Sequence, residues 1–174
     1  IGSDWSSDVC SSDLLVLPGG QMIMYTPQAL LEEFWDMKVP INPEFFANKL
    51  GLTVVREELG YRSGYLNEET GTIYVNAKEI PERQRFTIAH ELGHHCLGHG
   101  SAERNTVLPS GAKSYDPAKE AAANRFAADL IMPAIAVRAL VDKLNIKDPV
   151  KLRQALGVSS QALNLRLSTL GYFL

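Results

Sequence analysis

The chain has 174 residues, 45% of them hydrophobic and 21% charged, with 17 basic and 20 acidic residues. This composition is typical of a globular protein with a real core, and no apolar run approaches the roughly 20 residues of a membrane span. There is no basic excess of the kind that nucleic-acid phosphates attract. We therefore expect no membrane insertion and no direct nucleic-acid binding.

The first 14 residues differ in character from the rest. The string "DWSSDVCSSD" at residues 4–13 is similar to the translation of a common sequencing-library adapter. We interpret residues 1–14 as a disordered, non-native artefact and exclude them from fold reasoning. Without them the acidic and basic residues are equal in number, and Cys96 is the remaining cysteine. One cysteine makes no internal disulfide, which favours a reducing, cytoplasmic location.

Two helices are predicted first, over 26–37 and 42–51. Each has a capping residue directly before a proline, Thr26 in the first and Asn42 in the second. Three strands are then expected at 52–58, 61–67 and 71–77, because these stretches are rich in β-branched and aromatic residues around turn signals. They predict a small mixed or antiparallel sheet. We expect residues 71–76 to form an edge strand that could hold an extended peptide.

The remaining pattern is helical. A helix is predicted from about Pro81 to Leu97, and another over 116–133 is capped by Asp116 and ended by Pro133. The stretch 101–115 between them contains turn residues and little periodicity, which predicts a loop. The tail predicts helices at roughly 134–144, 149–156 and 160–169.

"HELGH" at residues 90–94 carries the chemistry. It fits the H-E-x-x-H pattern on a predicted helix, so His90 and His94 lie on one helical face and can bind one ion. Two neutral imidazoles suit zinc. Glu91 lies about 100° further round the helix, where it can accept a proton from water without ligating the metal.

A catalytic zinc needs a third protein ligand. His99 stands nine residues after His90, one short of the metzincin spacing, and Cys96 is a better core residue than a ligand. The preferred candidate is Glu120, in the first turn of the next long helix. Gly93 and the alanines of that helix favour a close approach, and Asn124, one turn after Glu120, is placed to hydrogen-bond a ligand. The alternative is that Glu120 binds no metal and is only a carboxylate favoured near a helix N-terminus.

These residues resemble a known family. "RFTIAHELGHHCLGH" followed by "EAAANRFAADLIMP", with "TIYVN" upstream and "ALGVSSQALNLRLSTLGY" downstream, is similar to the ImmA/IrrE family of metallo-endopeptidases over about residues 27–172. The family frequently has an acidic residue where this chain has Ala122.

The resemblance implies an α+β, zincin-like fold with an HExxH helix and a C-terminal helical, helix-turn-helix-like part. It implies a peptidase domain at 15–133 and a helical subdomain at 134–174. It also implies that His90, His94 and Glu120 bind Zn²⁺, that Glu91 is the catalytic base, and that the protein substrate is a helix-turn-helix repressor.

Two other interpretations stay open. The tail could be a DNA-binding helix-turn-helix with Gly157 in its turn, although few basic residues stand near its second helix and its leucines suggest a core surface. Those leucines are Leu163, Leu165, Leu167 and Leu170. The chain could also be a metal-bound regulatory protein that holds a partner without robust proteolysis.

Overall fold

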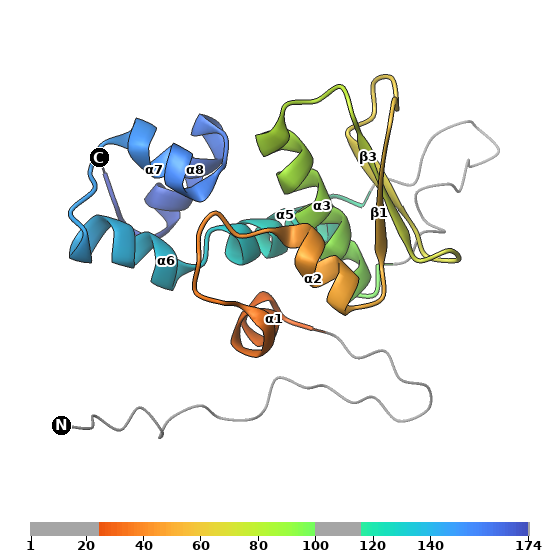
Figure 1. The fold of residues 1–174 in the computed structure, drawn as a ribbon, viewed down its shortest axis with the longest axis horizontal. Helices are drawn as coiled ribbons and strands as arrows, with labels where there is room; N and C mark the ends of the chain where they lie inside the picture. Colours follow the sequence, from red (N-terminus) through yellow and green to blue (C-terminus); the bar gives the residue numbers. More distant parts are fainter. Residues whose placement is uncertain (1–24, 100–115, 174) are drawn as a thin grey trace.

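The computed structural model describes residues 25–99 and 116–173, which form an α+β fold (Figure 1). The interpretation of residues 1–14 and the loop predicted at 101–115 lie outside the described residues. Helices α2 and α3 pack against the sheet, and α5 packs against α3. The predicted α+β class is thus confirmed.

The first two helices have the predicted caps. Helix α1, Pro27–Phe34, begins where the Thr26 hydroxyl accepts a hydrogen bond from the Ala29 amide at 3.1 Å. Helix α2, Pro43–Lys49, begins where the Asn42 side chain accepts one from the Glu44 amide at 3.1 Å. These side chains satisfy amides that have no partner inside the helix.

Three short strands form a mixed sheet. Strands β1, Thr53–Glu57, β2, Gly64–Asn67, and β3, Thr72–Asn76, lie in the order β1-β3-β2. β3 is parallel to β1 and antiparallel to β2. The expectation that residues 71–76 form an edge strand is therefore wrong, because β3 hydrogen-bonds to a neighbour on each side. Among the described strands, the edges are β1 and β2.

Helices α3, Pro81–Cys96, and α5, Pro117–Ile131, are the longest described helices. The Asp116 carboxylate caps α5 by accepting from the Ala118 amide at 2.9 Å. Helix α3 ends in a left-handed turn at Gly98, with φ of 64°. There the His99 amide donates to the His94 carbonyl and the Gly98 amide donates to the His95 carbonyl, which is the Schellman pattern.

The C-terminal helices begin and end close to the predicted positions. They are α6, Ala134–Arg138, continued by the π-helical turn η1, Ala139–Lys143, then α7, Pro149–Leu156, and α8, Ser160–Thr169. Of the leucines expected on a core surface, Leu163 and Leu167 are buried, but Leu165 is 70% exposed. The expectation for Leu165 is therefore wrong.

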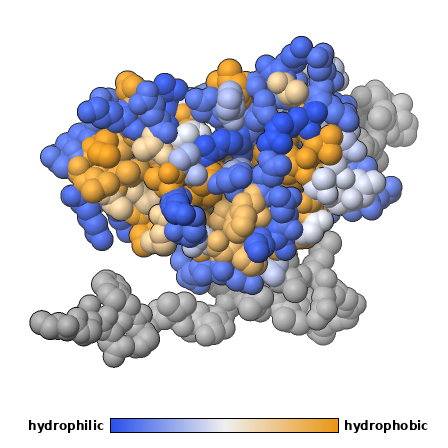
Figure 2. Space-filling model, in the orientation of Figure 1, coloured by the Kyte–Doolittle hydropathy of each residue, from blue (hydrophilic) through white to orange (hydrophobic). Residues whose placement is uncertain are grey.

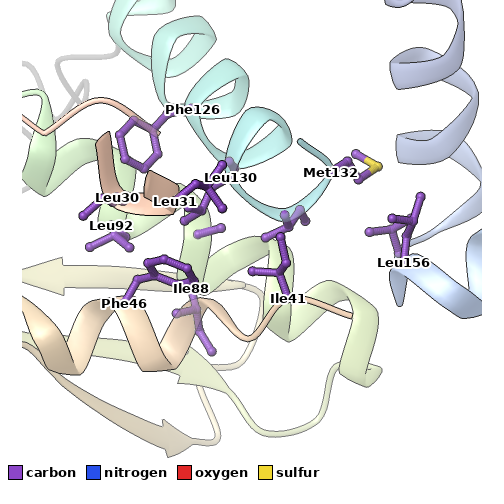
Figure 3. Close-up of a cluster of buried hydrophobic side chains, with 14 of the residues drawn as sticks. Leu30, Leu31, Ile41, Phe46, Ile88, Leu92, Phe126, Leu130, Met132 and Leu156 are labelled. Atoms are coloured by element: carbon purple, nitrogen blue, oxygen red, sulfur yellow. The ribbon is translucent and has the colours of Figure 1, made fainter. Parts of the chain in front are cut away.

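One hydrophobic core joins all of these elements (Figure 3). Phe46 of α2, Ile88 and Leu92 of α3, and Phe126 and Leu130 of α5 are each at most 3% exposed. The cluster continues into the C-terminal helices through Leu156, so the hydrophobic core extends across residue 133. The division into two domains at that residue stays a prediction. In the described ranges, no helix combines the length and apolarity that a bilayer crossing requires.

Candidate metal centre

Three side chains predicted as metal ligands lie together. One nitrogen each from His90 and His94 and a carboxylate oxygen of Glu120 lie within 4.8 Å of one another. The Glu120 oxygens are 3.3 Å from His90 Nε2 and 3.2 Å from His94 Nε2, and the two Nε2 atoms are 3.1 Å apart. Spacing along α3 and the start of α5 thus produces one cluster from two helices.

The orientation of His90 is set by Asn124. His90 Nδ1 lies 2.9 Å from Asn124 Oδ1. An amide oxygen only accepts, so Nδ1 carries the hydrogen and the Nε2 lone pair faces Glu120. This is the contact expected from Asn124, which stands one helical turn after Glu120 and therefore on the same face of α5.

His94 is oriented by a residue that the sequence analysis did not place. His94 Nδ1 lies 2.9 Å from His99 Nδ1, which leaves His94 Nε2 for the cluster. The Schellman turn explains the contact, because it commonly brings the residue after the left-handed glycine against the third residue before the C-cap. Here those two residues are His99 and His94. A glycine followed by histidine, four and five residues after His94, is the signal that could have indicated this contact.

A close helix crossing brings Glu120 within reach. A β-carbon added at Gly93 would lie 3.1 Å from Phe126 Cβ and 3.2 Å from Phe126 Cδ1, so any larger residue would crowd α5. Ala123 and Ala127 of α5 are fully buried. The expected role of Gly93 as a notch is therefore present, although the residue that occupies the notch is Phe126 rather than an alanine.

The other candidate residues of the motif helix have surroundings different from those of the cluster. Glu91 is 2% exposed, so its carboxylate is held inside the protein. His95 points to a different partner, Glu68, with His95 Nδ1 2.9 Å from a Glu68 oxygen. Cys96 is buried in the core, and burial raises the pKa of its thiol to about 12. A thiol in that environment does not supply the thiolate that metals bind.

The donor set fits a zinc ion. The lone pairs of two imidazoles and the charge of a carboxylate converge, which is favourable when a divalent cation neutralises them. Two nitrogens and one oxygen match the three protein ligands of catalytic zinc sites, whereas structural sites use four. The hydrogen bonds to the outer ring nitrogens are those that commonly orient metal-ligating histidines.

Comparison with known proteins agrees with this geometry. The IrrE N-terminal-like domain family matches residues 47–168, more than half of the chain. The radiation response metalloprotease IrrE of Deinococcus radiodurans is 51% identical over 39 residues, which is 22% of this chain and 12% of that protein. The IrrE protein of Deinococcus deserti is 43% identical over 47 residues, 27% of this chain and 17% of that protein.

A solved structure shows the same fold. A transcriptional regulator of Mycobacterium tuberculosis superposes with a TM-score of 0.59 at 18% identity, covering 82% of this chain and 46% of the regulator. The aligned regions thus span less than half the length of each of these relatives.

Two histidines on one helix and a glutamate on the next, in an α+β fold, form the arrangement of the metallopeptidase class. The chain belongs to the family of IrrE N-terminal-like domains, which is a peptidase family. This membership confirms the ImmA/IrrE resemblance of its sequence.

Proposed function

We propose that this chain is a zinc-dependent endopeptidase that cleaves a helix-turn-helix transcriptional repressor in the cytoplasm. The observation that carries the proposal is the convergence of His90, His94 and Glu120 beside the buried carboxylate of Glu91. Zinc is the preferred ion because catalytic zinc sites commonly have three protein ligands drawn from imidazole and carboxylate groups. The substrate class comes from the family resemblance, and the cytoplasmic location from the single cysteine outside residues 1–14.

The residues of the chain divide the work. His90, His94 and Glu120 would hold the ion, with Asn124 and His99 fixing the two rings. Zinc would supply Lewis acidity, which lowers the pKa of water towards neutrality and polarises a peptide carbonyl. Glu91 accepts the proton of the attacking water and returns it to the leaving amine nitrogen as the peptide bond breaks.

Strand β2 is the better candidate for holding an extended substrate. It is an edge among the described strands, and it runs beside the motif helix. A β-carbon added at Gly64 would lie 2.5 Å from Thr87 of α3, and Glu68, just after β2, contacts His95 at the other end of α3. A peptide paired with β2 would therefore lie along the helix that carries Glu91.

The test is the Glu91→Gln substitution. We expect the variant to keep one zinc per chain, measured by elemental analysis, because Glu91 is not in the ligand cluster. Cleavage of helix-turn-helix repressors from the same genome should fall by about 10²–10⁴-fold, since a general base is removed. Glu69→Gln, an exposed change of the same chemistry, is the matched control.

Two outcomes would contradict the proposal. Cleavage by Glu91→Gln at the wild-type rate would remove Glu91 from the chemistry. A zinc-loaded wild-type protein that binds a repressor but never cuts it, with or without chelator, would favour the regulatory interpretation.

A further inference from the structure

A groove opens between the peptidase helices and the C-terminal helices. The cavity has a volume of about 1030 Å³ and is lined by the start of α3, the outer face of α5 and one face of α8. In Figure 1 the first turns of α3 lie across from the helices α7 and α8, and α5 runs below them. This volume is at the upper end of the range for ligand pockets.

The groove has an apolar floor and two exposed apolar rims. Phe86 of α3, Ala128 of α5 and Met132, directly after α5, contribute to the floor. Ile80, at the start of α3, is 62% exposed, and Leu165 of α8 is 70% exposed. Large apolar side chains at the edges of a hollow are typical of a protein-binding surface.

The lining of the groove is basic. Its charged residues are the four basic Lys78, Arg83, Arg125 and Arg166 and only two acidic residues, Glu79 and Glu82, whereas acidic and basic residues are equal in number outside residues 1–14.

Arg125 is the basic residue most available to a partner. Arg166 is buried against Asp129 at 2.6 Å, and Lys78 pairs with Glu58 at 2.9 Å. Arg125 is exposed and makes no ion pair or hydrogen bond with any residue in the described ranges. It therefore offers a guanidinium to an incoming carboxylate.

The groove also borders two residues that contact His90. Asn124 lines it and binds His90 through the 2.9 Å contact with Nδ1. The Phe86 ring, which lies on its floor, stacks against the His90 ring with 6.4 Å between centroids. A segment bound in the groove would lie next to the cluster.

We propose that this groove binds an amphipathic helix of the protein substrate, with the apolar face of that helix between Ile80 and Leu165 and an acidic residue paired with Arg125. The inference rests on the proposed function, because it names the part of the substrate that docks beside the cleavage site. Grooves walled by helices accept helices through apolar residues spaced three and four apart. The repressors proposed as substrates are built from such helices.

The test uses the full chain carrying Glu91→Gln and loaded with zinc, so that nothing is cut. A phage-displayed library of random 16-residue peptides is selected on this protein. Enriched sequences should have apolar residues at i, i+3, i+4 and i+7 with Asp or Glu alongside. A synthetic copy of the most enriched peptide is then measured by fluorescence polarisation.

Two groove variants and two matched controls decide the result. Leu165→Asp should weaken binding by at least about tenfold, because an anchor is lost. Arg125→Glu should weaken it similarly and bind better when the acidic residue of the peptide is replaced by Lys. Leu144→Asp and Arg138→Glu, which change comparably exposed residues outside the groove, should leave the affinity unchanged.

The inference is overturned if no sequences are enriched, or if the selected peptide binds Leu165→Asp or Arg125→Glu as tightly as the parent protein. Because turnover is absent from this assay, failure here leaves repressor cleavage unaffected. Conversely, groove binding without cleavage by the wild-type protein would overturn the proposed function alone.

Discussion

His90 and His94 present the same ring atom, Nε2, to the Glu120 carboxylate, because the other ring nitrogen of each is engaged elsewhere. The two engaging residues differ in kind. Asn124 faces His90 with its amide oxygen, which only accepts, whereas a ring nitrogen of His99 can donate or accept according to its tautomer. The orientation of His90 therefore depends on one amide oxygen.

Removing that oxygen should weaken metal binding. We expect Asn124→Ala to lower zinc affinity by roughly 10–100-fold, because the His90 ring loses its orienting acceptor. Competition with a chromophoric chelator measures the affinity. Asn124→Asp keeps an acceptor and should retain most of the affinity, and Asn48→Ala, an exposed change on α2, should have no effect. Equal affinity for Asn124→Ala and wild type would show that the contact does not orient the ligand.

At the scale of residues, the pairing of His90 with His94 followed from helical spacing and the His99 contact did not. The pair His90 and His94 is set by the turn of one helix, and Asn124 by the turn of another. Placing His99 required the backbone path after the helix ends. Glu120 depended on how two helices cross, which the small size of Gly93 indicated without fixing.

At the scale of elements, the crossing of α3 and α5 is what joins the two halves of the site. Gly93 lies between His90 and His94 in sequence, and a β-carbon added there would lie 3.1 Å from Phe126 Cβ of α5. Phe126 is 3% exposed and its β-carbon moves only with the α5 backbone. The separation of the two helices is therefore fixed at the level of the cluster of His90, His94 and Glu120.

Enlarging this residue should separate the helices. We expect Gly93→Val to destabilise the fold by about 1–3 kcal/mol through overpacking, and to lower zinc affinity because Glu120 moves away from both rings. Denaturant unfolding and chelator competition measure the two effects. Gln154→Val, exposed on α7, controls for the cost of a β-branched residue in a helix. Wild-type zinc affinity in Gly93→Val would contradict the proposed coupling.

Helix starts were predictable from the sequence because they depend on local chemistry. Proline at the first position and Thr, Asn or Asp before it mark the starts of α1, α2 and α5. The order of the strands was not predictable, because pairing joins segments distant in sequence and a strand pattern is the same at the edge and in the centre. That is why the prediction for β3 was wrong.

At the scale of the whole molecule, the proposed ion would link α3 to α5 and thereby stabilise the core between them. Both helices contribute large side chains to the continuous hydrophobic cluster (Figure 3). A ligand that binds only the folded state stabilises it by mass action.

Metal loading should accordingly raise the melting temperature. Zinc at a 100-fold excess over its Kd contributes about 2.7 kcal/mol, which for a chain of this size corresponds to a Tm increase of roughly 5–10 °C. Differential scanning calorimetry with zinc and with chelator measures it. Glu120→Gln should show a smaller increase, and His95→Gln, a histidine outside the cluster, should show the full one. Equal Tm increases in Glu120→Gln and wild type would show that zinc does not bind through Glu120.

Exposed apolar side chains are not spread evenly over the surface of the molecule. Apolar side chains gather at the surface over the C-terminal helices (Figure 2), where Ile135, Leu144, Val150, Leu165 and Phe173 are exposed. The binary pattern predicted these helices but not the exposure of Leu165, because a leucine on a periodic stripe can face either a core or a groove.

The turn at Gly98 allows the same histidine contact to be predicted in other chains from their sequences. The turn at Gly98 ends α3 and also brings the His99 ring to Nδ1 of His94. One short segment, "HELGHHCLGH", therefore contains both the end of the helix and the residue that orients His94. Chains that share the interval H-E-x-x-H-x-x-x-G-H should carry the same edge-to-face pair of rings. One inserted or deleted residue before the glycine would rotate the last imidazole away from the second histidine of the motif. The length of this segment therefore distinguishes chains that have the histidine pair from chains that lack it.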